Sequence, residues 1–538
     1  MSKGYLGFVL HAHLPFVRHP EYEHFLEEDW LFEAISETYL PMLRMFNRLI
    51  ADGINFKLTF SISPTLSAML SDKLLMERYL AYLNNRIELG VKELDRNRDN
   101  PELIKIVEMY VALFRENFED FTTLYRKNIL WGFRNLEKEG VLEIITTAAT
   151  HAFLPVFEEY PQALEAQIQS AVISHGRNFG TKPKGFWLPE CGYFPGLENY
   201  LQVNNIDYFF VAAHGILLSD DNPKNGVYAP LQLPNGTFAF GRDFSLSEAV
   251  WSADTGYPGD PDYREFYRDI GHDLPLDYIR PHIQESDVRV NTGYKYYAVT
   301  GDTDQKKLYN SDLAKNKIED HSDDFINKLI AQIDKVEDRM DRVPFIVTPY
   351  DAELFGHWWF EGISWMESVI RKVSKNHDRL EMITPGRYLE IYPKSQPGIP
   401  SFSSWGNKGY SEVWIDGKND WIYRHLHKAI DRMSELVSRY PDESGLKLRV
   451  LNQAAREVLL SMASDWPFIM KTGTTVPYAV KRIREHIHNF NYIYDNLRRN
   501  TVDTGWLTRV ERKNNVFPDL DYTIFANPNN SSPVINSK

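Results

Sequence analysis

The sequence predicts an α/β protein built around a barrel of parallel β-strands. Short apolar runs rich in aromatic and β-branched residues recur through the first two thirds of the chain. Several are apolar almost without interruption, as strands buried on both faces of a parallel sheet require. Longer amphipathic segments separate them, and this alternation favours βα units. We expect seven strands, within residues 5–13, 55–63, 142–151, 185–190, 207–214, 237–243 and 344–356.

Two long segments interrupt this alternation. Residues 65–138 are rich in Leu, Glu, Arg and Lys and contain few helix breakers, which predicts a helical insertion. Residues 215–310 contain long connections rich in Gly, Pro, Asp and Tyr. Loops of this length are uncommon unless they form lids or binding walls, so we expect this segment to border a site.

The last quarter of the chain has a different pattern. The run "YPKSQPGIPSFSSWG", residues 392–406, is typical of a boundary between domains. Three later stretches, residues 424–440, 447–466 and 478–500, repeat apolar residues with the period of a helix. We therefore expect a barrel domain over residues 1–395, an all-helical domain over residues 396–525 and a mobile Asn/Ser-rich tail over residues 526–538.

Composition excludes several classes of partner. A formal net charge of −14 is unfavourable for binding nucleic acid or an anionic membrane surface, but it does not disfavour a neutral ligand. The only cysteine, Cys191, excludes an internal disulfide and is typical of a reducing cytosol. We see no signal peptide, and no run approaches the roughly 20 apolar residues of a membrane span. We expect a soluble, cytoplasmic protein, and we favour a monomer.

Polar side chains gather where the expected strands end. Because the carboxyl ends of parallel barrel strands lie on one rim, and that rim carries the active site, these residues define a candidate site. They are His11 and His13 after the first strand, His151 after the third, Glu190 after the fourth, His214 after the fifth and Asp351 after the seventh.

Glu190 and Asp351 are candidates for a catalytic pair. Retaining cleavage of a glycosidic bond needs two carboxylates about 5–5.5 Å apart, one as nucleophile and one as acid and then base. Tyr350, Phe355, Trp358 and Trp359 surround Asp351 in the sequence and favour a raised pKa, as a general acid requires. The alternative is that each acid caps a helix or pairs with an arginine.

The segment "HAHLPF" allows a metal hypothesis. His-x-His together with carboxylates can bind zinc, which would suggest a metal-dependent deacetylase. Against this, we find no acid near the pair that completes a compact set of ligands, and histidines also donate hydrogen bonds to sugar hydroxyls. We therefore favour a site without a metal, in which Glu353 and His357 orient the acid or the substrate.

Aromatic residues are abundant, with 12 Trp, 30 Tyr and 31 Phe. Composition alone favours an aromatic-rich core over sugar-stacking platforms. However, Trp251, Trp405 and Trp414 lie among glycines and polar residues, which indicates loop positions suited to stacking on glucose. For Trp421, stacking on glucose and packing of the C-terminal domain onto the barrel fit the sequence equally well.

The chain resembles glycoside hydrolase family 57, and within it the glycogen-branching-enzyme group with its α-amylase-like relatives. The resemblance spans residue 4 to about residue 500 and is carried by "HAHLPF", "TTAATHAFLP", "GFWLPECGY", "TPYDAELFGHWW" and "SSWGNKGYSEVW". It implies a (β/α)7 barrel and a retaining double displacement with no metal or other cofactor. By the motif match Glu190 is the nucleophile and Asp351 the acid/base. By the same match His11, His13 and His151 line the donor site.

The resemblance also implies residues for branching. Tyr228 in "NGVYAPL" resembles the tyrosine of a flexible loop that covers the active site in branching members, the alternative being a plain surface residue. Trp251, Trp405 and Trp414 resemble the aromatic residues of the acceptor side. Further substrate contacts are expected at Asp465, Arg264 and Trp358.

These observations together predict a 1,4-alpha-glucan branching enzyme whose partner is an α-glucan such as amylose, glycogen or starch. Three alternatives stay open. An α-amylase or 4-α-glucanotransferase would use the same carboxylates, a deacetylase would need a metal, and a glucan-binding protein would show no turnover.

Overall fold

All seven expected strands form and pair in parallel. The computed structural model describes residues 3–252, 255–283 and 288–526. In the sheet the strands follow the order β7–β5–β4–β3–β2–β1–β8, which confirms the predicted α/β class. Their bounds are β1 (Gly4–Ala12), β2 (Leu58–Ile62), β3 (Leu142–Thr147), β4 (Gly185–Trp187), β5 (Tyr208–Val211), β7 (Phe238–Gly241) and β8 (Phe345–Asp351).

The sheet curls so that its two outer strands meet. Just beyond β7, the backbone N–H of Asp243 donates to the carbonyl of Val347 in β8, at 2.9 Å. The rings of Phe240 and Phe345 meet edge to face across the same seam. The apolar cluster inside the barrel also contains Val9, Ile145, Trp187 and Phe210. The expected (β/α)7 barrel is therefore confirmed.

Three short strands extend the margins of the sheet. β9 (Leu380–Met382) pairs in parallel with β1, while β6 (Leu231–Gln232) runs antiparallel to β7. β10 (Gln396–Pro397) pairs with β6.

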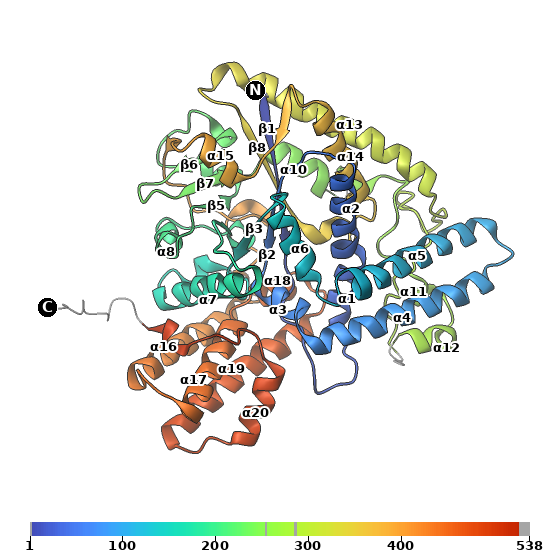
Figure 1. The fold of residues 1–538 in the computed structure, drawn as a ribbon. Coiled ribbons are helices and arrows are strands. Elements are labelled where there is room, and N and C mark those ends of the chain that lie inside the picture. Colours follow the sequence, from blue (N-terminus) through green and yellow to red (C-terminus); the bar gives the residue numbers. More distant parts are fainter. Residues whose placement is uncertain (1–2, 253–254, 284–287, 527–538) are drawn as a thin grey trace.

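Amphipathic helices surround the barrel (Figure 1). They include α1 (Glu28–Ala34), α2 (Leu40–Ala51), α7 (Pro161–Phe179), α8 (Leu197–Val203), α13 (Ser311–Val336), α14 (Gly362–Lys375) and α15 (Pro385–Ile391). Local signals set their ends. The Asn310 side chain accepts hydrogen bonds from the first backbone N–H groups of α13. Gly180 ends α7 in the left-handed conformation that glycine adopts without strain.

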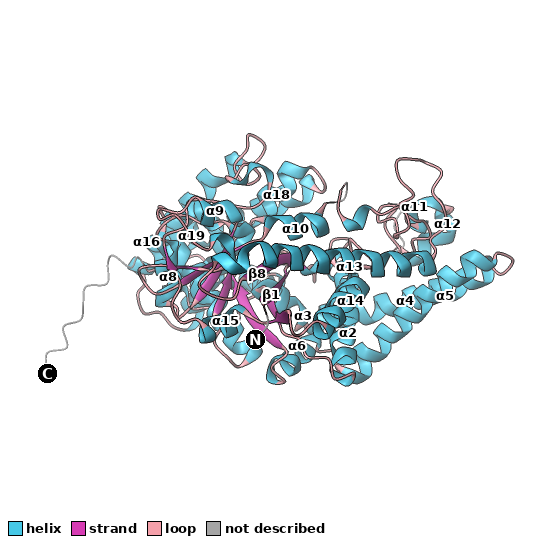
Figure 2. Cartoon of the chain, turned by 90° about the horizontal axis from the view of Figure 1, so that it is seen from above, coloured by secondary structure: helices cyan, strands magenta, loops and turns pink. Residues whose placement is uncertain are grey.

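Residues 65–138 contain helices, as their composition suggests. They are α3 (Pro64–Leu70), α4 (Lys73–Arg96), α5 (Pro101–Glu119) and α6 (Ile129–Lys138). α4 and α5 pack against each other and project from the barrel, as Figures 1 and 2 show. Asp72 and Asn100 cap their N-termini through side-chain hydrogen bonds.

The long connection over residues 215–310 is anchored to this helical pair. It contains the short helices α11 (Ile270–Asp273) and α12 (Leu276–Ile279), with α9 (Ala213–Leu217) and α10 (Phe244–Trp251) nearer the barrel. The Tyr110 hydroxyl of α5 donates to the carbonyl of Lys295, and the Tyr294 hydroxyl donates to the carbonyl of Arg86. The later half of the connection is therefore held away from the barrel axis.

The C-terminal region is helical and packs below the barrel in Figure 1. It consists of α16 (Tyr423–Arg439), α17 (Gly445–Ser461), α18 (Asp465–Thr472), α19 (Val476–Arg499) and α20 (Thr504–Lys513). The turn before α18 reaches the barrel, because the backbone N–H of Ser464 donates to the carbonyl of His151 at 3.0 Å. This contact brings residues 464 and 465 to the rim of the barrel.

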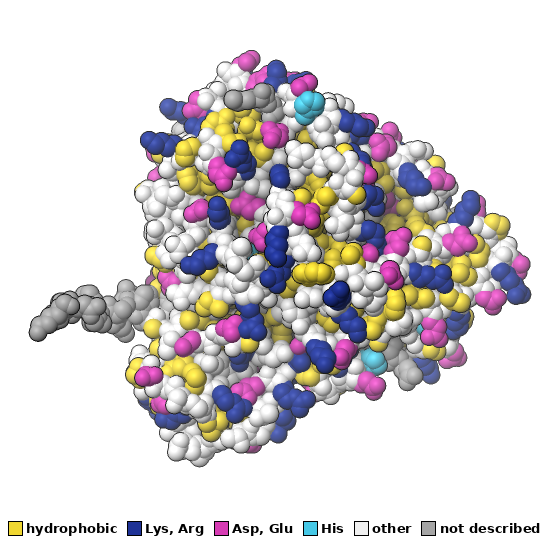
Figure 3. Space-filling view, viewed as in Figure 1, with side chains coloured by type: hydrophobic (Ala, Val, Ile, Leu, Met, Phe, Trp, Pro, Cys, Tyr) yellow, Lys and Arg dark blue, Asp and Glu magenta, His cyan; other side chains and the backbone are white. Residues whose placement is uncertain are grey.

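Basic and acidic side chains are interspersed over the face drawn in Figure 3. Among the described residues, none of the helices is both long enough and apolar enough to cross a membrane. The expected mobile tail, residues 526–538, lies outside the described residues except for Ala526.

Candidate active site

A cavity of about 460 Å³ opens at the carboxyl ends of the barrel strands. We call it the central cavity. Ten of the twelve residues expected to act or to bind substrate line it, so one rim brings together side chains from positions 11 to 465. These ten are His11, His13, His151, Glu190, Trp251, Asp351, Trp358, Trp405, Trp414 and Asp465.

Glu190 lies in a strained turn directly after β4. Its backbone has φ +61, and Cys191 next to it has φ +51, in a region that non-glycine residues rarely occupy. The Glu190 carbonyl accepts a hydrogen bond from the backbone N–H of Trp405, which helps to hold the turn. The turn directs the carboxylate into the central cavity.

Two donors hold the Glu190 carboxylate. The indole N–H of Trp405 donates to Oε2 at 2.7 Å, and the hydroxyl of Ser464 donates to Oε1 at 3.0 Å. Burial raises the pKa of Glu190 to about 7, although both hydrogen bonds favour the ionised form. The carboxylate is thus largely removed from water and fixed in orientation.

Asp351 has different surroundings at the end of β8. In the part of the chain that the structure describes, no side chain donates a hydrogen bond to its carboxyl group. Burial, followed by the nearby charges of Glu353 and Glu190, raises its pKa well above the usual value, and Arg242 only partly opposes this. Asp351 therefore lacks the donors that favour the ionised form of Glu190.

A chain of hydrogen bonds leads from Glu190 into the barrel. His151 Nδ1 lies 2.9 Å from Ser464 Oγ, and His151 Nε2 lies 2.9 Å from His11 Nε2. Ser464 has a single hydroxyl proton, and it donates this proton to Glu190. His151 must therefore donate from Nδ1 to Ser464 Oγ, and its Nε2 must accept from His11 Nε2. Ser61 then donates to His11 Nδ1, at 3.0 Å. Burial lowers the pKa of both histidines, so the whole chain is satisfied by neutral rings.

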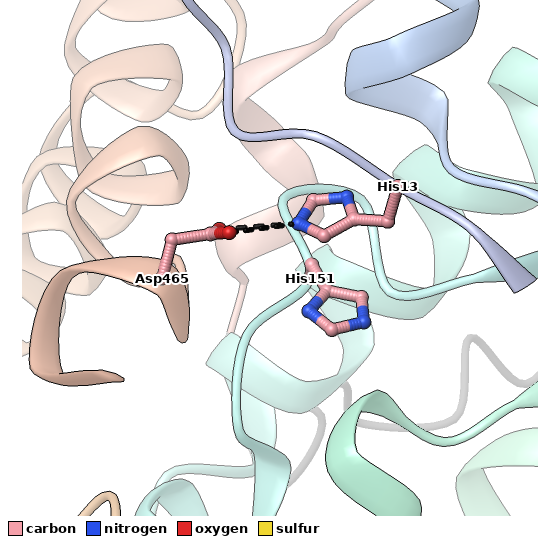
Figure 4. Close-up of side chains that lie close together, drawn as sticks. All are labelled: His13, His151 and Asp465. Carbon is pink, nitrogen blue, oxygen red and sulfur yellow. Dashed lines mark hydrogen bonds and ion pairs between the residues drawn. The ribbon is translucent and has the colours of Figure 1, made fainter. Parts of the chain in front are cut away.

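Among the described residues, His13, His151 and Asp465 form a group that could hold a metal ion, since their ligand atoms lie within 4.8 Å of one another. The sequence showed no acid near the histidines, but the fold brings Asp465 to them. Figure 4 shows the Asp465 carboxylate pointing at His13, whose Nε2 it meets at 3.1 Å.

The donor set does not fit a metal well. The rings of His13 and His151 stack at 3.9 Å with an interplanar angle of 16°, so their lone pairs do not converge on one point. His151 also uses both ring nitrogens on protein partners. His13 does the same, with Ser63 Oγ on Nδ1 at 2.9 Å and Asp465 on Nε2.

Aromatic rings form much of the cavity wall. Trp405 meets Trp187 and Trp251 edge to face, with ring centres 5.2 Å and 5.9 Å away. Trp358 is 51% exposed and stacks on Phe266 at 4.2 Å, which leaves an open aromatic platform at the edge of the cavity.

Trp414 and Trp421 are placed for packing more than for exposure. Trp414 reaches the cavity wall, but it is only 1% exposed and stacks on Phe153 at 4.8 Å. Trp421 does not line the central cavity and packs against the core.

Two expected substrate contacts do not line the central cavity. The Tyr228 ring packs against the core, and its hydroxyl accepts a hydrogen bond from Gln332 Nε2 at 3.1 Å. In this arrangement it does not cover the site as expected. Arg264 is buried elsewhere, 3.7 Å from Glu37 and donating to the carbonyl of His357 at 2.8 Å. Both positions follow from long-range packing that the local sequence does not reveal.

Four further lining or supporting residues were not singled out in the sequence. Arg242 follows β7 directly, so the rule that polar residues end barrel strands would have found it. Ser464 and Phe468 come from the C-terminal helical region, while Val413 lies in the motif "SSWGNKGYSEVW" next to Trp414. Glu353, expected to orient the site, lines the central cavity and accepts the backbone N–H of His13 at 3.2 Å. His357 instead contacts Glu37, at 2.6 Å.

Comparison with known proteins identifies related chains. Residues 7–399 match the model of Glycosyl hydrolase family 57, and residues 425–525 match the C-terminal model of 1,4-alpha-glucan branching enzymes. A 1,4-alpha-glucan branching enzyme of Thermococcus kodakarensis is 32% identical, over 96% of this chain and 77% of the relative.

Two solved structures have the same fold over nearly the whole chain. The alpha-amylase AmyC from Thermotoga maritima is 44% identical with a TM-score of 0.92, covering 98% of this chain and 99% of its own. A GH57-type branching enzyme from Pyrococcus horikoshii is 32% identical with a TM-score of 0.87, and the match covers 98% of this chain and 97% of that enzyme.

Proposed function

The chain belongs to glycosyl hydrolase family 57, and on this premise we propose that it is a 1,4-alpha-glucan branching enzyme. Membership confirms the family resemblance seen in the sequence. One observation carries the mechanistic part of the proposal. The two partly buried carboxyl groups on the rim differ in their hydrogen bonding, with two donors on Glu190 and none found on Asp351 among the described residues.

In the first step an α-1,4 bond is cleaved. Asp351 donates its proton to the glycosidic oxygen while the Glu190 carboxylate attacks the anomeric carbon. The C–O bond breaks, a glycosyl ester forms on Glu190, and the released chain leaves with a new 4-hydroxyl group. The raised pKa of Asp351 suits a group that must hold a proton near neutral pH.

In the second step the glycosyl group moves to a glucan. A 6-hydroxyl attacks the anomeric carbon, and the Asp351 carboxylate takes the hydroxyl proton. The ester bond to Glu190 breaks, which restores both carboxyl groups to their starting states. Two inversions give an α-1,6 bond with retained configuration.

Transfer competes with hydrolysis only where water is disfavoured and a sugar is held. Aromatic rings of Trp251, Trp405 and Trp358 around the cavity support such a role, because they offer surfaces on which a sugar can stack. The match of residues 425–525 to branching enzymes supports the same conclusion.

An α-amylase is the second candidate. It is favoured by the 44% identity to the alpha-amylase AmyC. Both enzymes would form the same ester on Glu190 and differ only in whether water or a 6-hydroxyl resolves it.

Proton NMR of amylose incubated with the protein tests the proposal. We expect new α-1,6 anomeric signals that are absent with Glu190→Gln. Reducing ends that accumulate without α-1,6 signals would identify an α-amylase. If neither signal changes, the α-glucan mechanism is wrong.

A chelator is expected to leave the rate of amylose turnover unchanged. Loss of activity on chelation would favour a metal-dependent hydrolase.

A further inference from the structure

A second cavity lies between α1, α4 and the turn η7 (Arg280–His282) that follows α12 (Figure 1). We call it the outer cavity. Its volume of about 350 Å³ lies within the range of small-ligand sites. Its lining residues come from the segments 23–32, 78–86 and 281–282, and none of them lines the central cavity. The outer cavity is therefore separate from the site of the two catalytic carboxyl groups.

Aromatic rings form the apolar part of the outer cavity. Phe25, Phe32 and Tyr82 line it, and the ring centres of Phe32 and Tyr82 lie 5.6 Å apart. The Arg86 guanidinium lies over the Tyr82 ring, 4.4 Å from its centre. Phe25 is only partly buried, and the ring of Tyr22, which is 46% exposed, lies 5.2 Å from it. The rings thus continue from the cavity to the protein surface, which suits a ligand with flat apolar faces.

Polar atoms of the lining residues lack partners. Within the described residues, Asn85 Oδ1, Arg86 Nε and His282 Nδ1 are buried and have no hydrogen-bond partner. Arg86 and His282 are only 3% and 4% exposed. Their neighbouring groups are already used, since Asn85 Nδ2 donates to the carbonyl of Pro281 at 3.1 Å and Arg86 Nη1 to the carbonyl of His282 at 2.9 Å. Buried polar atoms are nearly always paired, so three of them in the walls of one cavity indicate that its hydrogen bonding is completed by a ligand.

The charges of the walls favour a neutral ligand. The acids Glu23, Glu28 and Asp29 are opposed by the cations Arg78 and Arg86. Glu28 is engaged by Arg78 at 2.6 Å, which leaves it poorly suited to a metal ion. An anion would meet the three carboxylates, and a divalent cation would meet the two guanidinium groups. A polyhydroxylated chain avoids both penalties, because each hydroxyl can donate to a carboxylate or accept from a guanidinium group.

The outer cavity is built from connections that leave the catalytic rim. Residues 23–32 follow β1, α4 follows β2, and residues 281–282 follow β7. The helix that begins with α1 continues through η1 (Ile35–Tyr39), where the Tyr39 hydroxyl donates to Glu353 of the central cavity. At roughly 1.5 Å per residue, Asp29 and Tyr39 lie about 15 Å apart along this helix. A single oligoglucan chain can span that distance.

We propose that the outer cavity is a second α-glucan-binding site, in which Phe25 and Tyr82 stack on glucose units while Asn85, Arg86 and His282 bond their hydroxyls. Such a site holds the polymer beside the central cavity and so raises the local concentration of chains there. No covalent bond is made or broken in it. This inference rests on the proposed function, since it takes an α-glucan as the substrate.

The first test fills the outer cavity without removing a contact. Ala81 is an exposed residue of α4 that lines the cavity, so Ala81→Trp should block it. Ala112→Trp is the matched control, because Ala112 is exposed on the neighbouring helix α5 and lines neither cavity.

Initial rates are measured with amylose and with α-maltosyl fluoride, which is too short to reach both cavities. We expect Ala81→Trp to raise the KM for amylose about fivefold with kcat unchanged, because binding shared by ground state and transition state is lost. The rate with α-maltosyl fluoride should stay within about twofold, and Ala112→Trp should change neither substrate. An unchanged KM for amylose, or an equal loss on both substrates, would overturn the proposal.

A binding measurement separates this inference from the branching proposal. Maltoheptaose is titrated into the full-length Glu190→Gln variant by isothermal titration calorimetry. We expect two binding sites, of which added Ala81→Trp removes one and added Ala112→Trp neither. Phe25→Leu, which keeps an apolar side chain but removes the ring, should weaken the same site about tenfold.

The outcomes of this titration are distinct. A single site in the parent variant, or two sites that persist with Ala81→Trp, would overturn the outer cavity as a glucan site even if the enzyme branches. If the wild type makes no α-1,6 bonds but Ala81→Trp still removes one of two sites, the branching proposal fails and this inference stands.

Discussion

Glu190 and Asp351 lie on the same rim of the barrel, with β5 and β7 between their strands, and their surroundings differ in kind. Glu190 lies in a strained turn and receives hydrogen bonds from Trp405 and Ser464. Asp351 continues a regular strand, and the charge of Glu353 lies close to it. Burial raises the pKa of both carboxyl groups. The comparison shows how one site can hold a nucleophile and an acid, because hydrogen-bond donors favour the ionised form of one of two partly buried carboxyl groups.

The largest effect is expected for Glu190→Gln. An amide cannot form the glycosyl ester, so turnover of amylose should fall by about 10⁴-fold or more. The same loss is expected with α-maltosyl fluoride, whose leaving group needs no proton. The circular dichroism spectrum serves as the folding control. Activity retained on either substrate would assign the nucleophile elsewhere.

Asp351→Asn should separate the two roles. Removing the general acid is expected to slow amylose cleavage by about 10²–10⁴-fold. With α-maltosyl fluoride the release of fluoride in the first turnover should be affected much less, because fluoride leaves without protonation. Burst kinetics of fluoride release measure this difference. Equal losses on both substrates would mean that Asp351 does more than move a proton.

Ser464→Ala should make the surroundings of Glu190 more like those of Asp351. Losing one donor to the ionised carboxylate raises the pKa of Glu190 further above its value of about 7. The acid limb of the kcat/KM profile should therefore move to higher pH, by about 1 unit for a charge-assisted hydrogen bond. Ser461→Ala is the matched control, since that buried hydroxyl donates to the carbonyl of Val458. An unmoved acid limb would show that Ser464 is structural only.

Glu353→Gln tests the other side of the comparison. The charge of Glu353 helps to raise the pKa of Asp351, so its removal should lower that pKa. The basic limb of the kcat/KM profile is then expected to move to lower pH. Glu353 also accepts hydrogen bonds from Tyr39 and from the backbone of His13, so a thermal melt accompanies the profile. A shift of the basic limb to higher pH would contradict the assignment of Asp351 as the acid.

The smallest effect is expected for Tyr228→Phe. The hydroxyl of Tyr228 bonds Gln332 outside the central cavity and touches neither carboxyl group. Loss of this bond should cost about 1 kcal/mol of stability and change the ratio of α-1,6 linkages to reducing ends by less than about twofold. NMR and thermal melts measure both quantities. A large drop in the ratio would show that Tyr228 reaches the site during turnover.

Much of the fold and of the central cavity could be predicted locally. Each barrel strand is a short apolar run, and a polar side chain directly after the run must lie on the rim where parallel strands end. His11, Glu190 and Asp351 were found in this way, and the family motifs add Trp405 and Asp465. Arg242 follows the same rule, because it comes directly after β7.

Other features depend on contacts between distant segments. Ser464 reaches Glu190 because α17 and α18 pack against the turn at His151, more than 300 residues earlier in the chain. Tyr228 is drawn into core packing by Gln332 of α13, although its own segment looks like an open loop.

The sequence by itself determined the α/β barrel, the helical C-terminal region and the two carboxyl groups, because strand period, helix period and strand ends are local properties. Tertiary structure alone decided which donors meet each carboxyl group and where Arg264 and Tyr228 lie. The reason is physical. Local patterns fix which face of an element is buried, but hydrogen-bond partners and cavities depend on how those faces pack across hundreds of residues.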